Sequence, residues 1–114
     1  LPMSRIVVGG FSQGAMLATD TVLRLEEAPA ALAIFSGALV GEDEWTKLMP
    51  RRSGLTIVQS HGRHDPILPF QGAVLLRDLW KSAGADVSFV EFAGGHGIDG
   101  DVLDVFVKML RSKL

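Results

Sequence analysis

Apolar and polar positions alternate along this chain in blocks whose lengths fit strands and helices in turn. Short, continuous apolar runs are typical of strands that are buried on both faces of a sheet. Four such runs predict strands over residues 5–10, 31–37, 55–60 and 87–92. Longer stretches with apolar residues at helical spacing separate or follow them. Strands that alternate with helices indicate the α/β class, a parallel sheet with helices on both faces.

Three of the longer stretches predict helices with one apolar face. The first begins after Ser12, the second covers residues 70–83, and Asp99 can cap the third. A less regular stretch, residues 41–52, predicts a short helix that Pro50 ends. The apolar faces are assigned, helix by helix, to Ala15, Met16, Ala18, Val22, Leu23 and Leu25; to Val74, Leu75, Leu79 and Trp80; and to Val102, Leu103, Val105, Phe106, Met109 and Leu110.

The most informative stretch is Gly10-Phe11-Ser12-Gln13-Gly14, between the first strand and the first helix. A strand, a G-x-S-x-G motif and a helix form the context of a nucleophile elbow, in which a sharp turn exposes the serine hydroxyl. We expect a Cβ at either glycine to collide with the strand or the helix. The N–H of Gln13, at the helix N-terminus, is the predicted donor to a developing oxyanion. The alternative is a glycine-rich turn with a structural serine.

Two other glycine-rich loops do not fit this stretch. A dinucleotide fingerprint, G-x-G-x-x-G ending at Gly14, needs a glycine where Phe11 stands. A Walker loop needs lysine after its last glycine, and Gly14 is followed by Ala15.

Two further polar residues follow predicted strands and complete a possible catalytic set. Asp65 comes after the third strand and His96 after the fourth, and sites in open parallel sheets form beyond the carboxyl ends of strands. The chain order Ser12, Asp65, His96 is the order of the α/β-hydrolase triad. The alternatives are a turn-forming Asp-Pro at Asp65 and a loop histidine at His96 that bonds only to backbone.

The other two histidines precede Asp65 in the same predicted loop. We expect His61 to brace that loop and His64 to be solvated. A metal site built from His61, His64 and Asp65 is conceivable because all three are ligand types. It is disfavoured because the three residues are so close together in one loop.

Composition narrows the classes of function. The chain has 114 residues, 47% of them apolar, which fits at most one domain with a real core. The net charge is −2 with no basic run, which disfavours a nucleic-acid partner. The chain has no cysteine, so a thiol nucleophile is excluded. No apolar stretch reaches membrane-spanning length. We predict no cofactor, no metal and a cytoplasmic location.

The motifs together resemble one known family. Gly10-Phe11-Ser12-Gln13-Gly14, the loop from His61 to Pro69 with its His-Gly-x-x-Asp-Pro-x-x-Pro pattern, and Gly94-Gly95-His96 are similar to the phospholipase/carboxylesterase family of α/β-hydrolases, which includes the acyl-protein thioesterases. The resemblance implies that Ser12 is the nucleophile, Asp65 the acid and His96 the base. It also implies hydrolysis of a small-molecule ester or thioester through an acyl-enzyme, of the carboxylesterase, lysophospholipase or acyl-thioesterase type.

Members of that family are about twice as long, and the resemblance covers only their C-terminal half. Their first half supplies the early strands and a loop that donates the second oxyanion N–H. The first predicted strand here is apolar on both faces, yet only one other strand can pair with it. We therefore expect a larger unit, completed by an N-terminal segment or by self-association. A catalytically incomplete piece with a structural or interaction role, or a peptidase on the same scaffold, remain alternatives.

Apolar residues near the predicted strand ends are candidates for an acyl pocket. Each of them has core packing as the alternative. The candidates are Leu39, Trp45, Leu48, Met49, Ile67 and Leu68.

Overall fold

A computed structural model describes residues 1–113 and confirms the α/β prediction. Its centre is a parallel sheet of four strands in which the spatial order is the chain order. The strands are β1 (Val7–Phe11), β2 (Ala31–Phe35), β3 (Thr56–Gly62) and β4 (Asp86–Phe92). Each strand therefore pairs only with the strands immediately before and after it.

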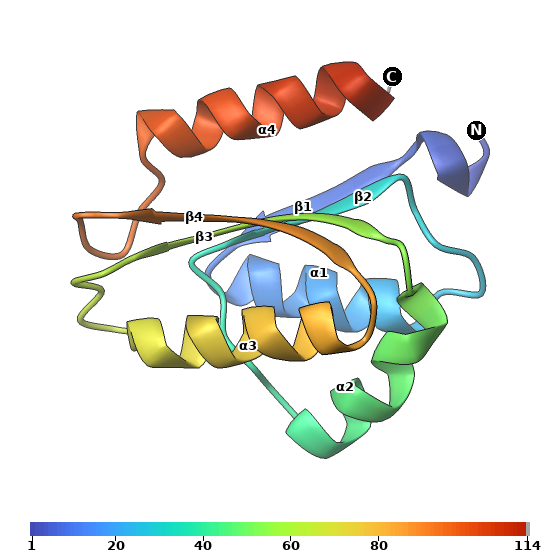
Figure 1. The fold of residues 1–114 in the computed structure, drawn as a ribbon, viewed down its shortest axis with the longest axis horizontal. Coiled ribbons are helices and arrows are strands. Elements are labelled where there is room, and N and C mark those ends of the chain that lie inside the picture. The colour runs from blue at the N-terminus through green and yellow to red at the C-terminus, as the bar shows by residue number, and fades with distance from the viewer. Residues whose placement is uncertain (114) are drawn as a thin grey trace.

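Helices cover both faces of the sheet (Figure 1). Every crossover adds the next strand on the same side, so right-handed crossovers place all three connecting helices on the same face. The fourth helix follows β4 and covers the opposite face. They are α1 (Gln13–Arg24), α2 (Glu42–Leu48), α3 (Phe70–Ser82) and α4 (Gly100–Lys113), with short 3-10 turns η1 (Met3–Arg5) and η2 (Met49–Arg52).

The continuous apolar run of β2 is explained by a separate core on each face of the sheet. All five residues of β2 are buried. Leu32 and Ile34 belong to the core under α1 and α3, whereas Ala31, Ala33 and Phe35 belong to the core under α4. In β1, Val8 packs against the first core and Val7 against the second. The strand is only partly buried because no strand within residues 1–113 pairs with its other edge.

Two predicted helix faces are wrong at one position each. Leu75 and Leu103 are 45% and 49% exposed. The buried side of α3 consists of Ala73, Leu76 and Trp80, and Leu75 is turned away from it by one residue step of about 100°. In α4, Val102 and Met109 are buried and Leu103 faces outward. The predicted cap is confirmed, since Asp99 Oδ1 accepts the N–H of Asp101 at 2.9 Å.

The ends of two other predicted elements also differ. The α-helix in residues 41–52 ends at Leu48, and Pro50 lies inside η2. Within η2, Arg52 is buried and donates to the carbonyls of Val22 and Leu25 at the end of α1. The predicted loop at His61 begins two residues later, because β3 continues to pair with β4 through Gly62. Across residues 1–113, none of the helices has the length and apolar character needed to cross a bilayer.

The two glycines of the elbow have different roles. A Cβ on Gly10 would lie 2.2 Å from the carbonyl oxygen of Gly14 and 2.7 Å from the nitrogen of Ala15. A Cβ on Gly14 would meet no atom within 4 Å. The expectation that a Cβ collides at both ends is confirmed for Gly10 and wrong for Gly14, which lies in the open first turn of α1.

This difference gives a matched pair of variants. We expect Gly10→Ala to lower the free energy of unfolding by about 2 to 3 kcal/mol, since backbone must move to admit the methyl group. Gly14→Ala should raise it by up to about 1 kcal/mol, because alanine is the better helix former. Urea unfolding of both variants in the whole protein measures the difference. Equal stabilities would contradict the steric role of Gly10.

Candidate active site

Ser12 sits at the turn between β1 and α1 in a conformation that is rare for a residue with a side chain. Its φ is 58° and its ψ is −119°. Its N–H donates to the carbonyl of Phe35 at 2.9 Å, which fixes the turn to β2. Its hydroxyl makes no capping bond to α1. Strained backbone of this kind persists where the surroundings over-determine it and is concentrated at functional sites.

The Ser12 hydroxyl meets His96, which lies in the loop after β4. His96 Nε2 is 2.9 Å from Ser12 Oγ, and His96 Nδ1 is 2.8 Å from Asp65 Oδ2. A carboxylate only accepts hydrogen bonds, so the hydrogen of the imidazole is assigned to Nδ1. Nε2 is then free to accept the hydrogen of the hydroxyl. The three residues predicted from strand ends therefore form one continuous hydrogen-bonded chain.

The side chain of Asp65 is fully buried, yet its carboxylate is well supplied with donors. Its side chain is 0% exposed. Oδ1 accepts the N–H of Ile67 at 2.8 Å and that of Leu68 at 2.9 Å. Burial raises the pKa of Asp65, but the bonds from Leu68, His96 and Ile67 outweigh it, and the pKa lies below its usual range. The charged form is therefore the stable one at neutral pH.

Close backbone approach and an aromatic ring hold His96 in place. A Cβ on Gly62 would lie 2.2 Å from the carbonyl oxygen of Gly95, so only glycine at the end of β3 lets the histidine loop come this near. The Phe11 ring lies against the imidazole with 5.0 Å between ring centroids. The His96 side chain is 14% exposed, which leaves it accessible from solvent.

Comparisons with known proteins identify the family of the chain. The sequence model of the phospholipase/carboxylesterase family matches residues 1–114. The chain belongs to the phospholipase/carboxylesterase family. The relatives described next are named as acyl-protein thioesterases and as an esterase, which supports a family of hydrolases.

Two curated relatives and one solved structure show how much of their length the chain spans. It is 30% identical to acyl-protein thioesterase 1 of Neurospora crassa, covering 100% of this chain and 48% of that protein. It is 35% identical to acyl-protein thioesterase 1 of Eremothecium gossypii, with 100% and 50% covered. The crystal structure of esterase PE8 superimposes with a TM-score of 0.90 at 31% identity, covering 100% of this chain and 53% of that one. The chain thus spans about half the length of these relatives.

Other polar residues that sequence analysis did not place in the site also contact the triad loops. Ser36, just after β2, has a φ of 52°, and its hydroxyl donates to the carbonyl of Gly97 in the histidine loop at 2.9 Å. His61 Nε2 lies 2.7 Å from the carbonyl oxygen of Leu68, which supports the prediction that it braces its loop. The predicted strand, residues 31–37, included Ser36 and so hid this role. Because β2 ends at Phe35, Ser36 directly follows a strand, as Ser12 does.

Two other predicted residues, Gln13 and His64, lie outside the hydrogen-bonded chain of Ser12, His96 and Asp65. Gln13 is the first residue of α1, so its N–H belongs to the unpaired first turn of the helix. His64 is exposed. Among residues 1–113, no group of three or more metal-binding side chains is close enough to hold an ion.

Most of the acyl-pocket candidates pack in the core instead of lining a space beside Ser12. Trp45 and Met49 are 2% and 1% exposed and belong to the core under α1 and α3. Trp45 also donates to Asp20 of α1 at 3.0 Å. Leu39 and Leu48 pack against the same core. Ile67, which is 64% exposed, and the partly buried Leu68 lie two and three residues after Asp65. Placement in a pocket stays a prediction for these two.

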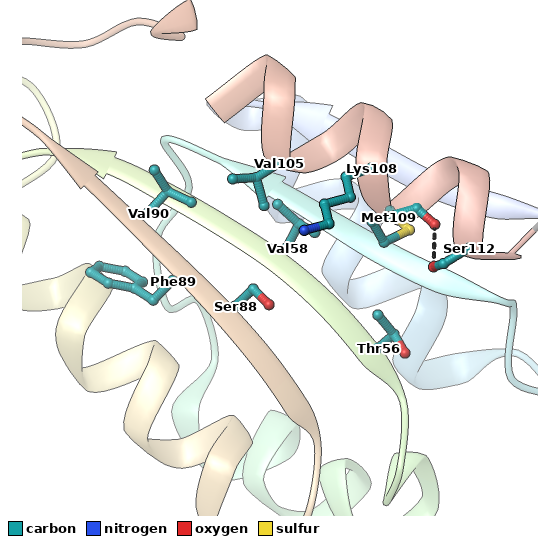
Figure 2. A pocket seen from close by; sticks show the side chains of 9 residues that line it. All are labelled: Thr56, Val58, Ser88, Phe89, Val90, Val105, Lys108, Met109 and Ser112. Atoms are coloured by element: carbon teal, nitrogen blue, oxygen red, sulfur yellow. Dashed lines mark hydrogen bonds between the residues drawn. The ribbon is translucent and has the colours of Figure 1, made fainter. Parts of the chain in front are cut away.

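A groove of about 580 Å³ lies elsewhere on the molecule, between α4 and the strands β3 and β4 (Figure 2). Val58 and Val90 line its floor and Lys108 extends over it from α4. It reaches Thr56, at the start of β3, whereas Asp65 follows the end of that strand. None of the three triad side chains lines this groove, so it is separate from the candidate site.

The lowered pKa of Asp65 predicts a pH-dependent contribution to stability. At neutral pH, Asp65→Asn should lower the free energy of unfolding by about 1 to 3 kcal/mol, because a charged acceptor of several N–H groups is lost. A depressed folded pKa stabilises above the unfolded value, so this difference should shrink as the pH falls from about 5 through the lowered pKa. Urea unfolding of both proteins across that range measures it. A difference that does not change with pH would contradict the assignment.

Proposed function

We propose that this chain carries the nucleophile, base and acid of a serine hydrolase that cleaves carboxylic esters or thioesters through an acyl-enzyme. The observation that carries the proposal is the continuous hydrogen-bonded chain from Ser12 through His96 to Asp65. The His96 tautomer with its hydrogen on Nδ1 leaves Nε2 able to accept a proton. The names of the relatives, acyl-protein thioesterases and an esterase, support the same class of substrate.

The first half of the proposed reaction acylates Ser12. Ser12 Oγ attacks the carbonyl carbon while its proton passes to His96 Nε2, and the carbonyl electrons move to oxygen. The N–H of Gln13 donates to that oxyanion. When the oxyanion collapses, the bond to the leaving oxygen or sulfur breaks and His96 returns the proton to it. Asp65 stabilises the imidazolium throughout and does not itself take the proton.

The second half regenerates the enzyme. Water takes the position of the departed alcohol or thiol and gives its proton to His96 as its oxygen attacks the acyl carbon. Collapse of the second oxyanion breaks the bond to Ser12 Oγ, which recovers its proton from His96. The net reaction consumes one water and releases a carboxylic acid and an alcohol or thiol.

Substitution of Ser12 tests the nucleophile. In the whole protein, Ser12→Ala should lower kcat on a short-chain nitrophenyl ester by about 10³-fold or more, since the triad acts as a unit. A fluorophosphonate should label the wild type and not the variant. Ser88→Ala, an exposed serine on β4 outside the triad, is the matched control and should keep full turnover. Labelling of another serine, or substantial turnover in the variant, would overturn the proposal.

A second candidate function, a catalytically incomplete piece with a structural or interaction role, is favoured by the open edge of β1. That strand pairs with β2 alone, and Phe11 at its end is 40% exposed. Unpaired N–H and C=O groups beside apolar side chains invite pairing with another strand. We propose that an N-terminal segment, or a second copy of the chain, covers this edge and supplies the second oxyanion donor.

Expression of residues 1–114 alone separates the two candidates. We expect association by light scattering and a loss of turnover of about 10²-fold or more relative to the whole protein, the cost of a missing oxyanion donor. The amount of fluorophosphonate-reactive serine normalises the two rates. A cooperatively folding monomer with full turnover would show that the site is complete without another segment.

A further inference from the structure

His61 lies beside the triad but does not belong to it. It is the second-last residue of β3, its side chain is 1% exposed, and the ring of Phe70 packs near it. Its Nε2 is 2.7 Å from the carbonyl oxygen of Leu68 and 3.3 Å from Asp65 Oδ2. Neither oxygen brings a hydrogen to the contact, so the hydrogen is assigned to Nε2 of His61.

The bond to Leu68 closes a ring of contacts around the carboxylate. Leu68 uses both of its backbone groups, because its N–H donates to Asp65 Oδ1 at 2.9 Å and its carbonyl accepts from His61. His61 therefore fixes the residue that orients one carboxylate oxygen. Its Nε2 also lies 3.3 Å from the other oxygen, Oδ2, which accepts from His96 at 2.8 Å.

His61 and His96 differ in what they can reach. His96 contacts the Ser12 hydroxyl and is partly exposed, whereas His61 is buried and its Nδ1 has no hydrogen-bond partner within residues 1–113. His61 therefore has no path to the reacting atoms. What it contacts is the carboxylate and the loop that holds the carboxylate.

We propose that His61 is a positioning residue that orients the Asp65 carboxylate toward His96 and limits how strongly that carboxylate holds the imidazolium. The proposal rests on the hydrolase function proposed above. The positive end of an N–H dipole whose nitrogen lies 3.3 Å from Oδ2 draws on the same negative charge that His96 uses. Without it, Asp65 is less well oriented, which slows the chemical step, and its charge favours the protonated form of His96 more strongly.

The other charged groups around this contact are engaged elsewhere. Arg63 and Glu91, on either side of the strand ends, pair with each other at 3.7 Å and are about half exposed. On α3, Arg77 pairs with Asp78. His64 is exposed, and Asp99 accepts an N–H at the start of α4. Within residues 1–113, none of their side chains bonds to His61 or to the Asp65 carboxylate.

Three variants in the whole protein test the proposal with a short-chain nitrophenyl ester. His61→Met removes the N–H, and kcat should fall about tenfold or more at unchanged KM. The acidic limb of its kcat/KM profile should move to higher pH. His61→Gln places an amide N–H near the position of Nε2. It should restore most of kcat and return the acidic limb close to its wild-type pH. Should His61→Met not fold, His61→Asn, whose amide is too short to reach Leu68, takes its place.

Gln59→Met is the matched control. Gln59 is buried two residues earlier on the same strand and face, and it donates to the carbonyl of Ala73 at 2.9 Å, away from the triad. Its loss should lower stability without moving the acidic limb. The low-field proton resonance of His96 Nδ1–H, identified by its loss in Asp65→Asn, gives a readout that needs no turnover. It should shift in His61→Met and not in Gln59→Met.

The outcomes separate this proposal from the proposed function. The positioning role alone would be overturned if His61→Met kept the wild-type acidic limb of kcat/KM and the wild-type His96 Nδ1–H resonance. It would also be overturned if Gln59→Met shifted both as much as His61→Met does. Turnover that survives Ser12→Ala would overturn the hydrolase assignment instead. The His96 Nδ1–H resonance, compared between His61→Met and Gln59→Met, would still report whether His61 orients the carboxylate.

Discussion

The buried carboxylate of Asp65 is the interaction on which the rest of the site depends. A charge with no exposed surface is stable only where donors surround it, and the N–H groups of Ile67, Leu68 and His96 provide them. Its charge assigns the hydrogen of His96 to Nδ1, and that assignment leaves Nε2 to Ser12. A neutral side chain of the same shape would fill the space but would not determine which imidazole nitrogen carries the hydrogen.

The sheet brings these groups together by placing polar residues at one level. Phe11, Phe35 and Ser60 are aligned by strand pairing, and Ser12, Ser36 and His61 each come one position later. The N–H of Ser12 and that of Ser36 continue the ladder to the carbonyls of Phe35 and Ser60. Apolar rows therefore give way to a polar row at the carboxyl edge. From this row come the nucleophile candidate and two residues that hold the neighbouring loops.

Much of this was predictable from sequence because it depends on local pattern. The alternation of apolar runs predicted four parallel strands, and the residues after three of them predicted Ser12, Asp65 and His96 as partners. What failed depends on tertiary contacts. Leu75 and Leu103 have apolar neighbours in sequence but point outward, and Gly14 has open space where a clash was expected. Trp45 and Met49 carry no mark in the sequence that separates core from pocket.

Arg52 shows the same limit for a charged residue. A run of two arginines at residues 51 and 52 suggests solvent, yet Arg52 is buried and donates to carbonyls at the end of α1. Nothing within its own segment identifies those partners. Only the packing of η2 against α1 places unpaired helix carbonyls within its reach.

The strand order has a consequence for when the site comes into existence. Each strand pairs with its predecessor, so every strand pairing joins segments that are neighbours in the chain. The contact between Ser12 and His96 is the opposite case, because it joins residues 84 positions apart. Under the proposed mechanism, a chain that has formed β1, β2 and β3 has Ser12 but not its base, His96. Ser12 then becomes an activated nucleophile only when the last strand and its loop are in place.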